Sequence, residues 1–205
     1  SRNHLNNTAL KYLDYADESS EKILDYKSEE IENKTRLEYN FEKNNYSINI
    51  GANLEDATYT NNTNQKFTVG ENIITGINNS DLHFIKYGVF TQISKTYFTN
   101  TLTSSFGLRI DGNSFTESTN SPNLSPRLSL AYNLNNKISV NSNIGRFYQL
   151  PSYTILGFDN NGNYLNKDAD YISCDHAVIG LEYSPSNYSK ITLESFYKSY
   201  NNYPF

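Results

Sequence analysis

The chain has 205 residues, which is enough for one sizeable domain or two small ones. Its net charge of -5 argues against nucleic-acid binding, which needs a basic face, and the lack of any run of eighteen or more apolar residues excludes a transmembrane helix. Only 37% of the residues are hydrophobic, yet 18 Tyr and 11 Phe are present. This polarity leaves a membrane barrel possible, because barrel strands alternate and score as hydrophilic on average.

The beginning of the chain is the least regular part. The segment SRNHLNNTAL lacks the features of a signal peptide and does not begin with Met, so we expect an excerpt of a longer protein. Residues 7–16 show a blurred alternation that predicts a first strand. We interpret residues 17–33, which are rich in charge, as a long charged loop, with a short helix over residues 20–26 as the alternative.

Strict alternation begins at residue 35 and predicts a hairpin. Leu37, Tyr39 and Phe41 share one face of the first strand, and the residues between them are polar. Asn44 and Asn45 predict a tight turn, because Asn tolerates a positive φ. After the returning strand, residues 55–81 are rich in Asn, Thr and Gly, and we expect a long polar loop there.

Six further strands and two further long loops are predicted by the same alternation. The strands are expected at residues 84–94, 101–111, 128–134, 138–145, 176–184 and 190–198, and the loops at 112–123 and 149–175. About eight strands result. The length of each strand is close to the about 9–11 residues that cross a bilayer at a tilt.

Short and long connections alternate along the chain. The tight turns are expected at residues 44–45, 95–100, 135–136 and 185–188. In an up-and-down antiparallel sheet, this rhythm places every short turn on one rim and every long loop on the other, as in outer-membrane barrels.

Charged residues fall on the face opposite the apolar one in the middle of the clear strands. This arrangement is typical of a barrel, where a Lys or Arg that faces lipid at the midplane costs about 2–4 kcal/mol. Arg146 is the exception, near a strand end. The charged residues that we expect to face the lumen, as candidate contact residues, are Arg109, Arg127, Glu182 and Glu194.

Aromatic residues gather in two groups, which predicts two interfacial girdles. The group near the short turns is Tyr39, Phe41, Tyr46, Tyr97, Phe98, Tyr132, Tyr183 and Tyr188, and the group toward the long loops is Tyr87, Phe147, Tyr148, Phe196 and Tyr197. The alternative is that Tyr and Phe are present only as good strand formers.

The segments LSPRLSLAYNL, NSNIGRFYQLP and VIGLEYSPSNYSKITLESFYKSYNNYP, with ENKTRLEYNFEKNNYSINIGANLEDATY before them, resemble the β-barrel of TonB-dependent outer-membrane receptors. The resemblance runs from about residue 32 to the end. It implies an all-β fold, an antiparallel up-and-down transmembrane β-barrel segment of about eight long strands.

Members of this family are similar in having a barrel of about 22 strands with a plug inside it, and a periplasmic segment that contacts TonB. The resemblance therefore implies an outer-membrane receptor fragment that lacks the plug and imports a siderophore, vitamin or glycan. Its expected partners are outer-membrane lipid, the plug and remaining strands, and TonB through the absent N-terminal region. The terminal Phe205 is interpreted as a coincidence of truncation rather than a barrel C-terminus.

We expect no catalytic site, no metal and no cofactor. The nearest metal pattern is Cys174, Asp175 and His176, but adjacent strand residues point to opposite faces and do not converge on one ion. Arg109 and Arg127 have two interpretations, contact with an anionic ligand or pairing with carboxylates of the plug or of neighbouring strands.

Four aromatic residues stand in the long polar loop after residue 149, and we treat them as candidate ligand contacts. They are Tyr153, Phe158, Tyr164 and Tyr171. Aromatic side chains on an exposed loop suit ligand capture, and packing of the loop itself is the alternative.

Two other classes of protein remain open at this point. A passive porin or small outer-membrane barrel closes these strands on themselves. A soluble secreted β-sandwich buries the apolar faces between two sheets, with Leu128, Ile138 and Leu193 inside.

Overall fold

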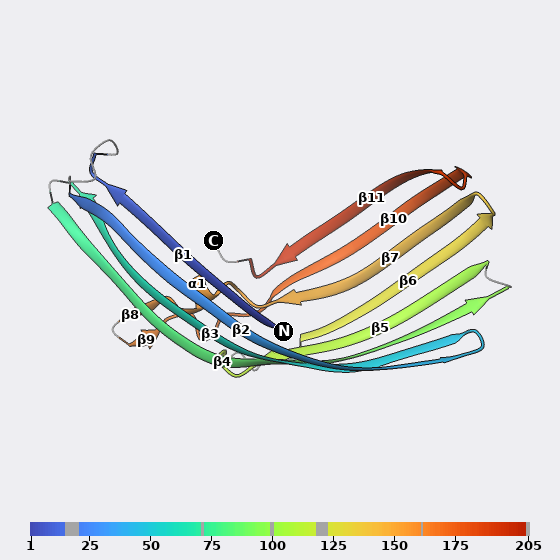
Figure 1. Cartoon of the computed structure of the whole chain (residues 1–205), viewed down its shortest axis with the longest axis horizontal. Coiled ribbons are helices and arrows are strands. Elements are labelled where there is room, and N and C mark those ends of the chain that lie inside the picture. Colours follow the sequence, from blue (N-terminus) through green and yellow to red (C-terminus); the bar gives the residue numbers. More distant parts are fainter. Residues whose placement is uncertain (15–20, 71, 99–100, 118–122, 161, 204–205) are drawn as a thin grey trace.

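One open, curved antiparallel sheet forms the molecule in the computed structural model (Figure 1). The structure describes residues 1–14, 21–70, 72–98, 101–117, 123–160 and 162–203. Within them, nine strands pair in the order β1-β2-β3-β4-β5-β6-β7-β10-β11, each with its neighbour in the chain, and β1 does not pair with β11. The up-and-down arrangement is thus confirmed, and neither a small closed barrel nor a two-sheet sandwich is found.

The strands are longer than we predicted. They are β1 (Arg2–Tyr12), β2 (Lys22–Lys43), β3 (Tyr46–Val69), β4 (Asn72–Tyr97), β5 (Leu102–Asn113), β6 (Asn123–Asn135), β7 (Ile138–Gln149), β10 (Ile172–Ser186) and β11 (Ser189–Asn201). The connection between β7 and β10 holds a short helix, α1 (Tyr153–Leu156), and a small hairpin of β8 (Asp159–Asn160) and β9 (Asn163–Tyr164).

Two expected loops are strands instead. Residues 22–33 belong to β2, and residues 55–69 and 72–81 form the outer halves of β3 and β4. Gly70, directly after β3, has a φ of +64°. Both faces of these segments are largely polar, so they lack the alternation that marks a strand between water and an apolar phase. Continuous backbone pairing of β2 with β3 and of β3 with β4 holds them in the sheet.

The other strand boundaries differ less from the predicted ones. The first strand covers residues 2–12 rather than 7–16. Residues 17–20 of the expected charged loop lie outside the described residues, as do residues 99–100, residues 118–122 and Phe205. The connection from residue 150 to residue 171 lies within the predicted long loop, with its own short elements.

The short turns predicted at residues 44–45, 135–136 and 185–188 are found there, and the one predicted at residues 95–100 lies partly outside the described residues. Asn44 has a φ of +51°, the left-handed conformation that Asn tolerates. In the turn from β6 to β7, Oδ1 of Asn135 accepts hydrogen bonds from the backbone N–H of Lys137 at 2.8 Å and of Ile138 at 3.1 Å. These side-chain contacts close the hairpin that the alternation indicates.

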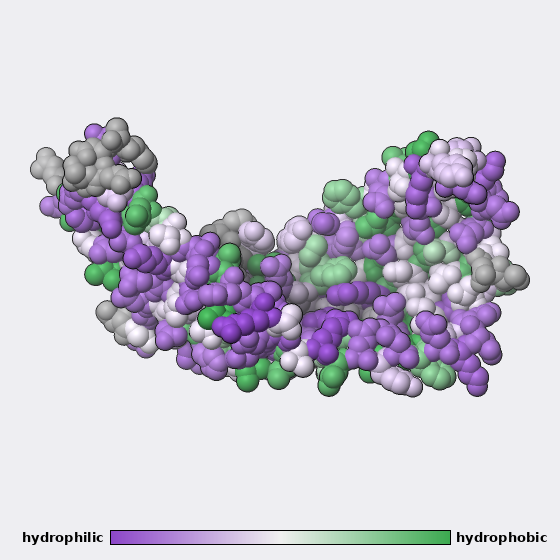
Figure 2. Space-filling model, in the orientation of Figure 1, coloured by the Kyte–Doolittle hydropathy of each residue, from purple (hydrophilic) through white to green (hydrophobic). Residues whose placement is uncertain are grey.

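The two faces of the sheet differ in chemistry. On the apolar face of β2–β11, large side chains are open to the surroundings, for example Leu37 at 73% and Leu193 at 71% exposure. The opposite, polar face carries Arg109 and Arg127. Hydrophilic residues also cover most of the side seen in Figure 2. No helix among the described residues is long and apolar enough to cross a membrane.

Aromatic residues near the short turns lie on the apolar face, as predicted for Tyr39, Tyr46 and Tyr132. On the long-loop side the prediction was only partly right. Strand alternation places Tyr87 on the apolar face but Phe147 on the polar one. Tyr87 and Tyr97 lie on the same face of β4, about 34 Å apart along the strand. With the usual tilt, this matches an apolar band about 25 Å tall.

Arg146, the charge on the apolar face, is paired rather than free. Its Nε and Nη2 bind the two carboxylate oxygens of Asp175 at 2.6 and 2.7 Å. This bidentate pair neutralises both groups near the end of the strands, where the apolar band stops.

The strands β2, β3 and β4 continue beyond this band and bend, so that they cover both arms of the molecule in Figure 1. The outer part of β2 pairs with β1, from Asn33 to Lys22. The segment 150–171 packs on the polar face of this extension. There it forms the buried apolar cluster of Ala57, Tyr59, Leu82, Phe84, Tyr153 and Leu156.

Candidate functional site

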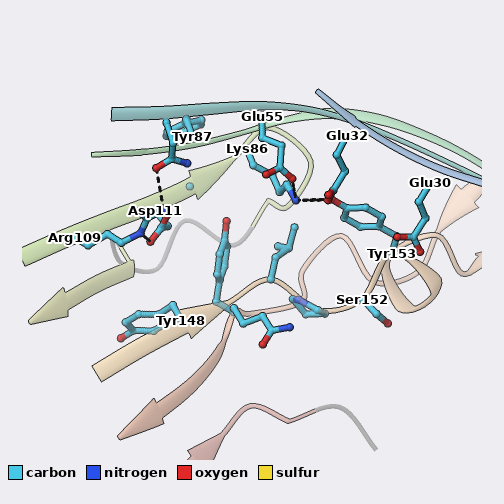
Figure 3. A pocket seen from close by; sticks show the side chains of 16 residues that line it. Glu30, Glu32, Glu55, Lys86, Tyr87, Arg109, Asp111, Tyr148, Ser152 and Tyr153 are labelled. Atoms are coloured by element: carbon cyan, nitrogen blue, oxygen red, sulfur yellow. Dashed lines mark hydrogen bonds and ion pairs between the residues drawn. The ribbon is translucent and has the colours of Figure 1, made fainter. Parts of the chain in front are cut away.

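A cavity of about 350 Å³ lies between the polar face of β2–β5 and the start of the segment 150–171 (Figure 3). Its charged lining residues are Glu30, Glu32, Glu55, Lys86, Arg109 and Asp111. Tyr153 and Tyr171 supply aromatic walls. Because side chains from four adjacent strands and from residues after β7 point into one cavity, the polar face is the concave one.

A cluster of paired charges forms one wall of the cavity. The ammonium of Lys86 binds Glu32 at 2.9 Å and also contacts Glu55. Lys34 bridges the same two carboxylates, at 2.7 Å from Glu32 and 3.1 Å from Glu55. The glutamate side chains are only 16% and 13% exposed, so they are held with their counter-ions rather than by water.

Tyr153 joins the segment 150–171 to this cluster. Its hydroxyl donates to Glu32 at 2.5 Å and accepts from Lys86 at 2.5 Å. Tyr153 as a residue is 8% exposed, and its ring packs edge-on against Phe84 at 5.4 Å and beside Tyr59 at 6.0 Å. Burial and the nearby Glu32 raise the pKa of the Tyr153 hydroxyl far above its usual range, which keeps it a donor.

A second charged group lies lower on the same wall. Arg109 binds Asp111 through Nε at 2.7 Å and Nη2 at 2.5 Å, and Nη2 also donates to Asn53 at 3.0 Å. Gly88 leaves the space for this group. A Cβ there would lie 2.6 Å from Oδ1 of Asp111, 2.8 Å from Oδ1 of Asn53 and 3.0 Å from Nη2 of Arg109.

We expect Gly88→Ala to displace the Arg109 group and to destabilise the full-length protein by about 1–3 kcal/mol, the usual cost of overpacking. Gly107→Ala is the matched control, because a Cβ at that glycine meets nothing nearer than 3.6 Å. Urea unfolding of both variants measures the difference. Equal stability of the two variants would contradict the close packing at Gly88.

The comparison with protein families covers the whole chain. A family model described as TonB dependent receptor-like, beta-barrel matches residues 1–205. The chain belongs to this family. A search of curated proteins finds no match.

Solved structures of TonB-dependent receptors share the fold of this receptor barrel at low sequence identity. The copper transporter OprC matches with a TM-score of 0.68 and 13% identity, over 96% of this chain and 34% of that chain. The siderophore receptor PirA from Acinetobacter baumannii matches with a TM-score of 0.61 and 14% identity, over 97% and 31%. The ferric enterobactin receptor PfeA from Pseudomonas aeruginosa matches with a TM-score of 0.51 and 14% identity, over 97% and 34%. The chain thus spans about a third of the length of these structures.

The predicted lumen residues of this receptor barrel lie on the concave face but not in one group. Arg127 stacks on the ring of Phe147 at 4.3 Å, and no ion pair of Arg127 is found among the described residues. Glu182 binds Lys190 at 2.7 Å near the short turn, and Glu194 lies opposite Gly180 on β11. Among the described residues neither Glu182 nor Glu194 pairs with Arg109 or Arg127, because the register sets these carboxylates nearer the other rim.

Three of the four loop aromatics pack the segment 150–171. Besides Tyr153, Tyr164 donates to the carbonyl of Asp81 at 2.6 Å, and Tyr171 accepts from Nδ2 of Asn113 at 3.0 Å. Phe158 is 49% exposed. The structure therefore uses three of these rings to hold the loop, and Phe158 remains open to the surroundings.

Sequence reasoning missed Glu30, Glu32 and Glu55, half of the charged cavity lining, because it treated residues 17–33 and 55–81 as loops. Glu30, Glu32 and Lys34 recur at every second position, which is the period of a strand with one charged face. That signal was present. Of the pattern at residues 174–176, Asp175 pairs with Arg146 on the face away from Cys174 and His176, as the alternation predicts.

Proposed function

We propose that the chain supplies barrel wall and extracellular loops to a TonB-dependent receptor in the bacterial outer membrane. The receptor imports a scarce nutrient, such as a siderophore, vitamin or glycan, and is not an enzyme. In this proposal, lipid surrounds the apolar face, the plug and the remaining strands complete the barrel, and TonB acts through the N-terminal region of the full-length protein.

One observation carries the proposal, which is the position of the cavity relative to the apolar band. The band is bounded by aromatic residues and by short turns on one rim. On the other rim, β2–β4 extend past the band and the segment 150–171 folds over the concave face. A cavity at that rim lies where a ligand enters the barrel from outside the cell.

The mechanism that follows has two steps. The ligand is first held at the rim by polar and aromatic side chains of the cavity and by exposed loop residues such as Phe158. Rearrangement of the plug, driven from the inner membrane, then opens the path through the barrel. The wall described above stays fixed, because ion pairs and the Tyr153 anchor hold it.

Expression and deletion of the full-length gene test this proposal. We expect its product in outer-membrane fractions, and we expect growth on its nutrient to require both the receptor gene and TonB. Screening the three nutrient classes as sole sources, with and without TonB, gives the measurement. Uptake that persists without TonB would instead favour the passive porin.

A further inference from the structure

The cavity beneath the segment 150–171 contains a carboxylate that its own cations do not neutralise. Asp111 is paired with Arg109, and the half-buried Glu32 and Glu55 share Lys34 and Lys86. Glu30 also lines the cavity. No ion pair or hydrogen bond of its side chain is found in the part of the chain that the structure describes.

The position of Glu30 makes this lack of a partner costly. Glu30 lies two residues before Glu32 on β2, and Figure 3 shows both side chains on the side of the strand that faces the segment 150–171. Glu30 is half-buried and lies opposite Leu5 on β1 and Tyr59 on β3. Burial and the like charge of Glu32 raise the pKa of the Glu30 carboxyl, and the more distant charge of Lys86 offsets only part of this rise. A cation placed beside it would relieve both effects.

The aromatic walls favour the same kind of ligand. Tyr153 and Tyr171 line the cavity with Glu30, and aromatic faces attract cations. The protein already uses this contact, because Nζ of Lys86 lies 5.0 Å from the centre of the Tyr153 ring. A volume of about 350 Å³ suits one group of a ligand rather than a whole large nutrient.

We propose that this cavity binds a positively charged group of the imported ligand, such as a primary ammonium, and that Glu30 is its counter-ion. The inference rests on the proposed function, because it assumes that the receptor imports a ligand. It adds the charge of one group of that ligand. An anionic group is disfavoured at this position, because it would meet the unneutralised Glu30 carboxylate.

Two probes of the same ring and opposite charge test the inference on the purified full-length receptor. Saturation-transfer NMR measures binding of phenethylammonium and of phenylacetate. We expect phenethylammonium to bind and phenylacetate not to bind. Glu30→Gln should weaken phenethylammonium roughly tenfold, since it removes the charge but keeps the shape. Glu29→Gln is the matched control, because Glu29 lies next to it on the opposite face, paired with His4.

Equal binding of the two probes, no binding of either, or an unchanged affinity in Glu30→Gln would overturn the inference. Growth assays with and without TonB are read separately. If the probes behave as expected but uptake continues without TonB, the proposed function fails and the charge assignment stands. If uptake needs TonB but phenethylammonium does not bind, the charge assignment fails alone.

Discussion

Leu130→Arg is expected to lower the free energy of unfolding of the full-length receptor in lipid bilayers by about 2–4 kcal/mol. Leu130 lies on the apolar face of β6 and is 40% exposed. On our proposal this exposure is to lipid, where an arginine cannot be solvated at mid-depth. Folding into vesicles of a single phosphatidylcholine, followed by urea titration, measures the change.

The control is Ser129→Arg, one residue earlier on the same strand and on the concave face. There the guanidinium faces the polar lumen rather than lipid, so we expect a change within about 0.5 kcal/mol, as for ordinary surface substitutions. Equal effects of the two variants would show that the apolar face does not meet lipid. A larger effect of Ser129→Arg would reverse the assignment of the faces.

Tyr153→Ala is expected to release the segment 150–171 from the wall. The substitution removes a ring that is 8% exposed and a hydroxyl shared by Glu32 and Lys86. Deleting a buried aromatic ring costs about 3–5 kcal/mol. Hydrogen exchange at the amide of Gly157, which donates to the carbonyl of residue 153 at 2.7 Å, should rise at least about a hundredfold.

Tyr153→Phe separates the two contributions. It keeps the ring and loses only the hydroxyl, so we expect a loss of about 0.5–1.5 kcal/mol. Phe158→Ala is a control in the same segment, because that ring is 49% exposed and its loss should leave exchange at Gly157 unchanged. Slow exchange at Gly157 in Tyr153→Ala would mean that the segment is held elsewhere.

The parts of the fold that sequence predicts well are those where the two faces of a strand meet different environments. Leu128, Leu130 and Tyr132 alternate with polar residues, and the structure places them on one face of β6, paired with β7 as expected. The turns at Asn44 and Asn135 were equally predictable from the sequence, because a side chain or a backbone conformation closes each hairpin locally.

The outer halves of β2, β3 and β4 could not be predicted from the sequence in this way. Both of their faces are largely polar, so apart from the charges at Glu30, Glu32 and Lys34 a strand there leaves little alternation in hydropathy, and composition indicates a loop. Their pairing depends on backbone hydrogen bonds to neighbours far along the chain, such as Glu30 with Tyr59 and Tyr59 with Leu82. Such pairing is a property of the register of the whole sheet.

Local order in the chain was therefore enough to predict an all-β fold, most of its strands and the chemistry of their two faces, because each depends on neighbours a few residues apart. The candidate site required the tertiary structure. Glu32, Lys86 and Tyr153 are far apart in the chain, and they meet only because the register aligns β2 with β4 and the segment 150–171 folds back onto them. Sheet curvature and loop packing bring these charges together, and neither has a signature in the sequence near any one of them.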